Sequence, residues 1–232
     1  TSLRRDGYSA FGTSNPRATF YSTALAWTFT NEKFFQWEAM SMGKLRFSWG
    51  QNGNRSLSNP YIALADLVPS VGTQGYIDAN GNHVQYQLLR INRLANTHLQ
   101  WEKTTSWNIG LDYGFFNNRL SGTMDYYIMP TTDMIMNQSL PGFSGFGSIT
   151  TNLGEVENRG FELSINSANI KNKVVEWNTT FGLSVYKNTI KHLYYVYENI
   201  LDENGNVIQI KEKDDIANRW FIGEAISSIW DY

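Results

Sequence analysis

The 232-residue sequence contains no cysteine, which excludes disulfide bonds and thiolate metal sites. Charged residues make up only 17% of the chain, whereas a soluble domain has about 25%. The formal net charge of −2 gives no bulk attraction for nucleic acid, so we expect no nucleic-acid partner. No run of about 18 apolar residues is present, which excludes a transmembrane helix. This absence does not exclude a membrane β-barrel, because the strands of such a barrel alternate and never produce a long apolar run.

Aromatic residues, in contrast, are abundant at 15% of the chain, and there are 19 glycines. The segment 101–115 alternates strictly. Its odd positions include Trp107, Ile109 and Leu111, whereas its even positions include Asn108 and Gly110. This period of two predicts a strand with one apolar face and one polar face.

Five further segments alternate in the same way: 20–29, 44–49, 120–128, 161–166 and 175–186. Lys103 is the one charged residue on the apolar faces of these segments, near a strand end from which its long stem can reach the interface. We expect four representative apolar positions to face lipid: Trp27, Trp107, Leu111 and Phe181. We expect five charged positions of the opposite faces to point into the lumen: Arg46, Glu102, Asp112, Asp125 and Glu162.

The connections between these segments alternate in length. Residues 116–119 and 170–173 form short turns, whereas 50–98, 131–158 and 188–222 are long. Short turns at one end and long loops at the other are typical of outer-membrane barrels. The sequence therefore predicts an all-β fold, an antiparallel transmembrane β-barrel segment. Residues 31–43 are a longer connection on the short-turn side, where we expect an interfacial helical turn.

Two other classes share the alternation. A soluble β-sandwich that binds carbohydrate would bury the apolar face against a second sheet. A small outer-membrane barrel acting as an adhesin or receptor would have about eight strands. The near-absence of charge on one face, the strand lengths and the loop asymmetry favour a membrane barrel over the sandwich.

Several strings resemble the SusC/RagA group of TonB-dependent outer-membrane transporters. The most specific are LQWEKTTSWNIGLDYGFFNNRLSGTMDYY at 99–127 and NLGEVENRGFELSI at 152–165. RRDGYSAFG at 4–12 and LPGFSGFG at 140–147 also resemble that group, and the strings occur in the same order as in the family. The resemblance implies a bacterial outer-membrane barrel of roughly 22 strands with a plug. It also implies energy input from TonB, a SusD-like surface lipoprotein as partner, and oligosaccharide or peptide substrates.

Residues 1–232 are expected to be part of the barrel domain of such a receptor. Neither the plug domain, through which TonB would act, nor the terminal barrel strands match any part of this sequence. About seven strands of the later barrel are expected.

No arrangement of residues typical of an enzyme is found, and no cofactor is expected. The three histidines, His83, His98 and His192, lack a ligand partner at metal-binding spacing. Asn-Gly pairs at 80–81 and 204–205 predict type I′ hairpin turns rather than calcium loops. Packing of the loops against each other or against a lid partner is the favoured role of the aromatic residues in the long connections, and stacking on a substrate is the alternative. Five of them are the candidates for substrate or lid contact: Tyr61, Tyr76, Tyr86, Phe143 and Phe146.

Overall fold

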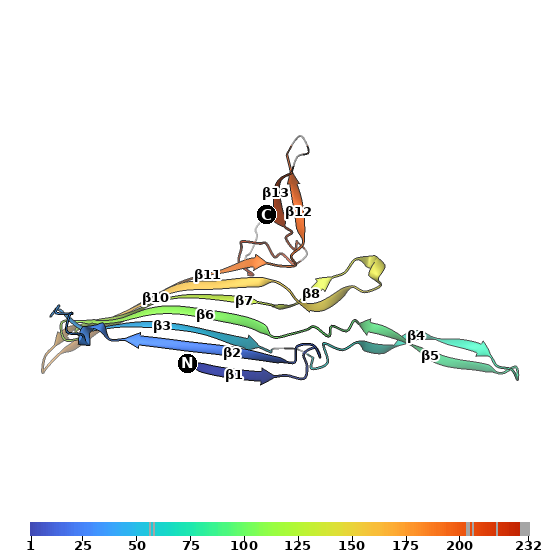
Figure 1. Ribbon diagram of the computed structural model, residues 1–232, viewed down its shortest axis with the longest axis horizontal. Helices are drawn as coiled ribbons and strands as arrows, with labels where there is room; N and C mark the ends of the chain where they lie inside the picture. The colour runs from blue at the N-terminus through green and yellow to red at the C-terminus, as the bar shows by residue number, and fades with distance from the viewer. Residues whose placement is uncertain (56, 58, 203–204, 206, 217, 228–232) are drawn as a thin grey trace.

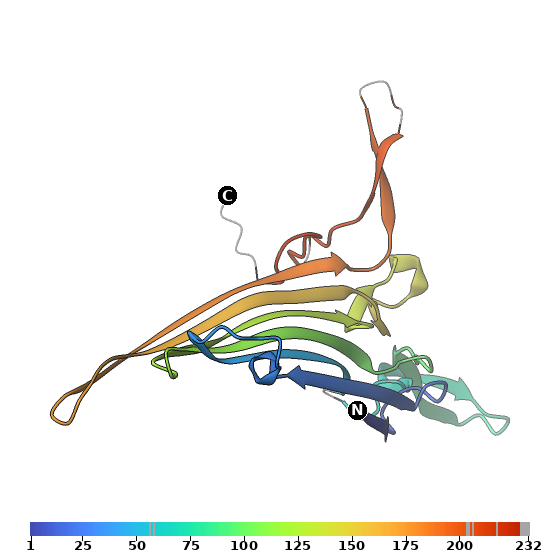
Figure 2. The same ribbon diagram turned by 60° about the vertical axis from the view of Figure 1, so that its left-hand side comes forward.

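The computed structural model describes residues 1–55, 57, 59–202, 205, 207–216 and 218–227, without the side chains of 70–74 and 86. Within this described part, seven long strands form one antiparallel sheet in the order β1-β2-β3-β6-β7-β10-β11. Their bounds are β1 Ser2–Gly7, β2 Arg17–Trp27, β3 Met40–Asn54, β6 Glu102–Phe115, β7 Leu120–Thr132, β10 Glu155–Lys171 and β11 Glu176–His192. Figures 1 and 2 show them as a curved, open wall.

The expected barrel-segment architecture is confirmed, and all six strands predicted from alternation are present. Several are longer than the alternation indicates. β10 has 17 residues and β3 has 15, because their polar ends continue the ladder beyond the apolar stretch. The sequence pattern gave no sign of β1, whose residues SLRRDG do not alternate.

Three two-stranded hairpins rise from the long connections at one end of the sheet (Figure 1). Their strands are β4 Asp66–Ile77 with β5 His83–Arg93, β8 Ile135–Ser139 with β9 Ser148–Asn152, and β12 Tyr197–Leu201 with β13 Val207–Glu212. Each hairpin is closed near its root by a backbone hydrogen bond, such as that from the N–H of Asn96 to the carbonyl of Ala63. The loops at this end therefore have regular structure of their own.

The opposite end of the sheet carries the tight connections. Phe116, Asn117 and Asn118 all have positive φ, between 53° and 62°, in the turn that joins β6 to β7. The helical turn expected within 31–43 lies earlier, as the 3-10 helix η1 at Phe29–Asn31. The other described helix, η2 at Gly142–Ser144, is equally short, so neither could span a membrane.

The predicted turn chemistry at 80–81 is wrong in one respect. A type I′ turn needs positive φ at both central residues, and only Gly81 has it, at 83°. The reason is the side chain of Asp78, whose Oδ1 accepts hydrogen bonds from the backbone N–H groups of Asn80 and Asn82. This local bonding favours a wider turn. The turn after Leu201 falls partly outside the described residues.

A small hydrophobic core lies at the loop end of the sheet. Leu99 and Trp101 are buried there with Phe11, Phe20 and Ala63. Trp101 was expected to begin the apolar face of its strand, but it precedes β6 and is only 4% exposed. Its ring packs against those of Phe11 and Phe20, so it anchors the loops instead.

Candidate functional site

The strand register builds the apolar side of the sheet. Residues paired across an antiparallel ladder share a face. Leu111 pairs with Leu45 on one side and Met124 on the other, and these pairings extend across six strands. One complete row reads Trp27, Leu45, Leu111, Met124, Leu163, Leu183. The adjacent row on the same side reads Leu25, Phe47, Ile109, Tyr126, Phe161, Val185.

These two apolar rows are largely uncovered. Trp107, Trp27 and Phe181, which lie on the same side, are 46%, 47% and 51% exposed. Leu111 is half-buried among its neighbours. No other part of the described chain forms a second sheet over this side. The structure thus places the four residues expected to contact lipid on one continuous, open apolar surface.

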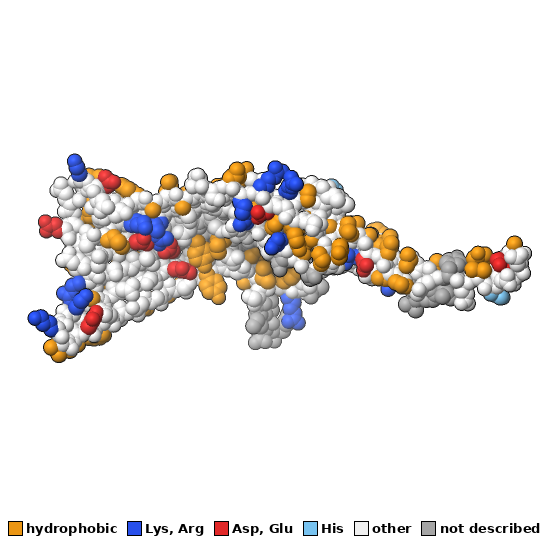
Figure 3. All heavy atoms as spheres, turned by 90° about the horizontal axis from the view of Figure 1, so that it is seen from below, with side chains coloured by type: hydrophobic (Ala, Val, Ile, Leu, Met, Phe, Trp, Pro, Cys, Tyr) orange, Lys and Arg blue, Asp and Glu red, His pale blue; other side chains and the backbone are white. Residues whose placement is uncertain are grey.

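The opposite side of the same six strands is polar. Its central row reads Ala26, Arg46, Gly110, Asp125, Glu162, Ser184. Figure 3 shows a broad, mostly white surface over the long strands, with basic and acidic side chains close together on it. The charged residues expected to face the lumen therefore lie opposite the apolar rows.

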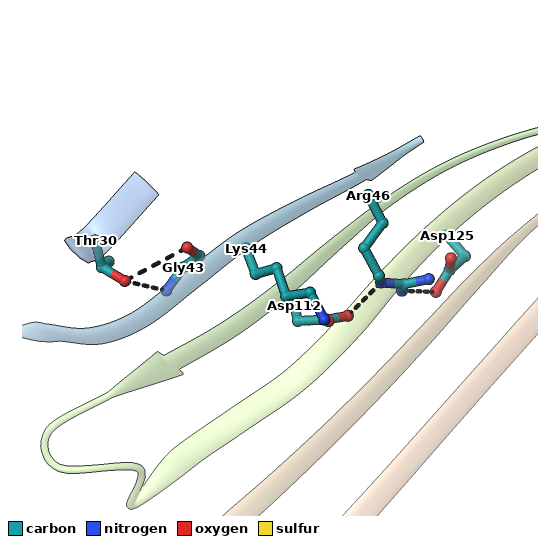
Figure 4. A network of polar contacts seen from close by, with 6 residues as sticks. All are labelled: Thr30, Gly43, Lys44, Arg46, Asp112 and Asp125. Carbon is teal, nitrogen blue, oxygen red and sulfur yellow. Dashed lines mark hydrogen bonds and ion pairs between the residues drawn. The ribbon is translucent and has the colours of Figure 1, made fainter. Parts of the chain in front are cut away.

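Three of those charged residues form a network, shown in Figure 4. Arg46 Nε donates to Asp112 Oδ1 at 2.8 Å, and Arg46 Nη2 donates to Asp125 Oδ2 at 2.9 Å. Lys44 Nζ lies 3.8 Å from the second oxygen of Asp112. The two carboxylates are balanced by two cations, so the network links β3, β6 and β7 with no excess charge.

A glycine makes room for this network. Gly110 lies between Arg46 and Asp125 in the polar row. A Cβ at this position would come within 2.5 Å of Asp125 Oδ1 and 2.6 Å of Arg46 Nη2. The guanidinium can therefore cross β6 because no side chain projects there.

The other two predicted lumen residues do not join the network. Glu102 lies nearer the loops, where it accepts hydrogen bonds from the backbone N–H of Ile135 and from Asn54 Nδ2. It ties the root of the β8–β9 hairpin to β6. Glu162 is exposed on β10, opposite Asp125 in the register.

At the loop end, Glu212 holds the β12–β13 hairpin against β11. Its carboxylate contacts His192 Nδ1 at 2.7 Å and accepts from the backbone N–H groups of Leu193 and Tyr195, both at 2.8 Å. Burial opposes ionisation of Glu212, but the hydrogen bonds from His192 and the two N–H groups outweigh it and lower its pKa. The sequence shows His192 only as a histidine without a partner at metal-binding spacing and gives no sign of this contact.

A second, half-buried contact supports the same hairpin. The hydroxyl of Tyr194 donates to Asp215 Oδ2. Burial, reinforced by the hydrogen bond to the neighbouring carboxylate, raises the pKa of Tyr194 to about 12. The phenol therefore stays protonated at all ordinary pH values and acts as a fixed donor.

The candidate loop aromatics lie on separate elements. Tyr61 is 66% exposed in the turn before β4, and Tyr76 is 55% exposed on β4 itself. Phe143 is 93% exposed in η2, with Phe146 half-buried just after it. The side chain of Tyr86 lies outside the described residues. The four described side chains are thus distributed over the turn before β4, β4 itself and the region of η2, and their role in ligand contact stays a prediction.

Nothing in the described chain resembles a metal or catalytic centre. No group of three or more His, Cys, Asp or Glu side chains comes close enough there to hold a metal ion. The Glu212 carboxylate that contacts His192 already accepts hydrogen bonds from two backbone N–H groups, and no nucleophile contacts this pair among the described residues.

Comparison with known proteins agrees with this geometry. TonB-dependent receptor P3 of Formosa agariphila is 36% identical over 231 residues, which are 99% of this chain and 22% of that protein. TonB-dependent receptor SusC of Bacteroides thetaiotaomicron is 31% identical over 97% of the chain and 23% of its own length. The chain thus spans less than a quarter of these two relatives.

Solved structures give the same result. The structure of the RagAB peptide importer in the open-open state superposes with a TM-score of 0.74 and 28% identity, covering 96% of this chain and 22% of that one. A separate structure of the RagAB peptide transporter gives a TM-score of 0.71. Residues 1–222 also match the profile described as "TonB dependent receptor-like, beta-barrel". The chain therefore belongs to the TonB-dependent receptor β-barrel family of the bacterial outer membrane, and its resemblance to the SusC/RagA group is confirmed.

Proposed function

We propose that this chain is a wall segment of a TonB-dependent importer, with the apolar rows against lipid and the polar rows toward the lumen. The observation that carries this proposal is the pair of unbroken apolar rows across six strands, open to the surroundings. Apolar area costs about 25 cal/mol per Å² when it stays in water. An apolar surface this continuous is stable only against lipid or another protein surface.

The polar side suits a lumen. It carries charged groups that are paired with one another rather than packed in a core, as in the Arg46 network. Strands spanning a bilayer need about 9–11 residues, and β6, β7, β10 and β11 all reach that length. The β-sandwich alternative requires a second sheet over the apolar rows, and the family membership also favours the barrel.

The substrates and partners of the whole transporter are proposed from its relatives. The RagAB structures carry the description of a peptide importer, and the SusC/RagA resemblance also suggests glycans. We propose an oligosaccharide or a peptide as substrate, a SusD-like lipoprotein lid over the loop end, and TonB acting through a plug elsewhere in the protein. Among the candidate loop aromatics, Tyr61, Tyr76 and Phe143 have exposed side chains that a substrate or a lid could contact.

The decisive test compares arginine substitutions on the two sides of one strand in the intact transporter. Leu111→Arg places a charge on the proposed lipid side, at a cost of about 2–4 kcal/mol near the bilayer midplane. Asn108→Arg places the same charge on the polar side of β6. Phe181→Arg repeats the lipid-side test on β11.

We expect Leu111→Arg and Phe181→Arg to reduce the amount of folded, heat-modifiable barrel in outer-membrane fractions severalfold. Asn108→Arg should leave that amount close to the wild-type level. Equal recovery of all three variants would contradict the assignment of the two sides.

A further inference from the structure

A polar pocket of about 450 Å³ lies between the end of β3 and the strand β1, at the loop end of the sheet. Arg4, Arg5, Arg55, Asp6 and Trp101 are among the residues that line it. Basic side chains gather in the middle of the surface in Figure 3, over the region of β1. This pocket is separate from the neutral Arg46 network deeper along the wall.

The register places the pocket on the polar side. Arg4 is opposite Phe20 in the β1–β2 ladder, so the two share a face. Phe20 is six residues before Ala26 on β2 and alternates in the same phase, and Ala26 belongs to the polar row with Arg46. The Arg4 side chain therefore projects on the side that the proposed function assigns to the import path.

Aromatic rings support two of the arginines. The guanidinium carbon of Arg4 lies 5.6 Å from the ring centroid of Phe20, and that of Arg55 lies 5.4 Å from the ring centroid of Tyr8. A guanidinium stacked on a ring is held in place while its N–H edge stays available for a ligand. The two aromatic rings thus orient the guanidinium groups of Arg4 and Arg55 before a ligand binds.

The charge of the pocket is unbalanced. Asp6 is the one acidic residue in its lining, and its Oδ2 lies 2.9 Å from Arg4 Nε. Among the described residues Arg55 forms no salt bridge, whereas Arg5 is opposite Thr19 in the ladder and projects on the other side of the sheet. Trp101 adds a buried indole N–H with no acceptor in the described part of the chain. The lining therefore supplies donors and positive charge in excess of acceptors.

A group that satisfies such a lining must be an anionic acceptor with several oxygens. Carboxylates and sulfates meet a guanidinium fork through two parallel hydrogen bonds. A neutral hydroxyl would leave the excess charge uncompensated. We infer that this pocket binds an oxyanion group of the imported oligomer, so that the transporter selects acidic substrates. This inference rests on the proposed import function and deepens it.

The test measures binding of four probes to the intact transporter, purified in detergent, by isothermal titration calorimetry. Tri-galacturonate and tri-aspartate carry carboxylates on a saccharide and on a peptide, and maltotriose and tri-alanine are neutral counterparts. The Arg4→Gln/Arg55→Gln variant removes both stacked forks. The Arg159→Gln/Lys187→Gln variant is the control. It removes two cations that lie opposite each other in the β10–β11 ladder near the loop end, on the side of the apolar rows.

We expect wild-type protein to bind at least one acidic probe about tenfold or more tightly than its neutral counterpart, and the acidic probe that binds identifies the substrate backbone. The Arg4/Arg55 variant should lose that preference, whereas the Arg159/Lys187 variant should keep it. Equal binding of acidic and neutral probes, no binding of acidic probes, or an unchanged preference in the Arg4/Arg55 variant would each overturn the inference. Heat-modifiable migration of every protein in outer-membrane fractions tests the barrel separately, so a normal barrel without acid preference refutes only the pocket.

Discussion

Arg46 on β3 reaches Asp125 on β7, two strands away, with Nη2 to Oδ2 at 2.9 Å. On its way the guanidinium also binds Asp112 of the intervening strand, so one side chain joins three strands. Both carboxylates are 18% exposed, and Arg46 is 32% exposed. An ion pair with this degree of burial and two charge-assisted hydrogen bonds contributes more than a surface pair.

Replacing Arg46 with Gln should lower the free energy of unfolding by about 1–3 kcal/mol, because Asp112 and Asp125 would lose their shared partner and repel each other. Lys44→Gln is the matched control, since its contact with Asp112 is 3.8 Å long and more exposed. That control should cost under about 1 kcal/mol. Denaturant unfolding of the barrel in detergent measures both, and equal losses would refute the three-strand link.

Filling the glycine beneath the network should have a related effect. Gly110→Val places methyl groups where Arg46 and Asp125 now meet, so the bridge must open. We expect a loss of about 1–3 kcal/mol from the overpacking. Gly182→Ala on β11 is the control, because a Cβ there meets nothing within 4 Å. The midpoint of heat-modifiable gel migration should fall for Gly110→Val alone.

A second contact across three strands lies near the short-turn end. Tyr113 on β6 donates its hydroxyl to the carbonyl of Ser164 on β10 at 3.2 Å, passing over Gly122 of β7. Tyr113→Phe should cost about 0.5–1.5 kcal/mol through the lost hydrogen bond. Gly122→Ala should cost more, because its Cβ would lie 1.9 Å from the Ser164 carbonyl oxygen and the backbone must move. Denaturant midpoints in the opposite order would contradict this packing.

The Glu212 contact predicts a pH-dependent hairpin. Its pKa in the folded protein lies below the ordinary value of 4.5. The ionised carboxylate therefore stabilises the hairpin root fully above pH 4.5, and this contribution is lost as the pH falls through the lowered pKa. Hydrogen exchange at Leu193 and Tyr195, corrected for intrinsic rates, should accelerate in that acidic range.

Glu212→Gln should show fast exchange at these two N–H groups already at neutral pH. Glu198→Gln, an exposed residue on the same hairpin, provides the control and should behave as wild type. Identical pH profiles of hydrogen exchange for wild type and Glu212→Gln would show that this carboxylate does not hold the hairpin root.

Alternation predicted the six apolar strands because burial against lipid or a core imposes a period of two on the sequence. It also assigned Arg46, Asp112 and Asp125 to one side. Their partnership could not be foreseen, because the contacts join residues 66 and 79 positions apart and depend on register between strands. Trp101 was misplaced for a related reason, since its burial depends on loops that fold back from Phe11 and Leu99.

Polar segments were the other source of error. β1 and the two strands of the β8–β9 hairpin have no apolar periodicity. They are held by backbone hydrogen bonds to a partner strand, which their own residue pattern does not reveal. The turn at 78–82 followed the side chain of Asp78 rather than the Asn-Gly pair. Local side-chain bonding there outweighs the dipeptide preference.

Each projecting hairpin completes its own hydrogen-bonded ladder and is fastened at its base by a backbone hydrogen bond, such as that from the Lys213 N–H to the Val196 carbonyl. The length of such an arm is thereby uncoupled from the strands below. The strand pairings of the wall do not pass through these arms, so we expect the loop-end rim to accept shortened, extended or exchanged segments while the register of the wall is kept.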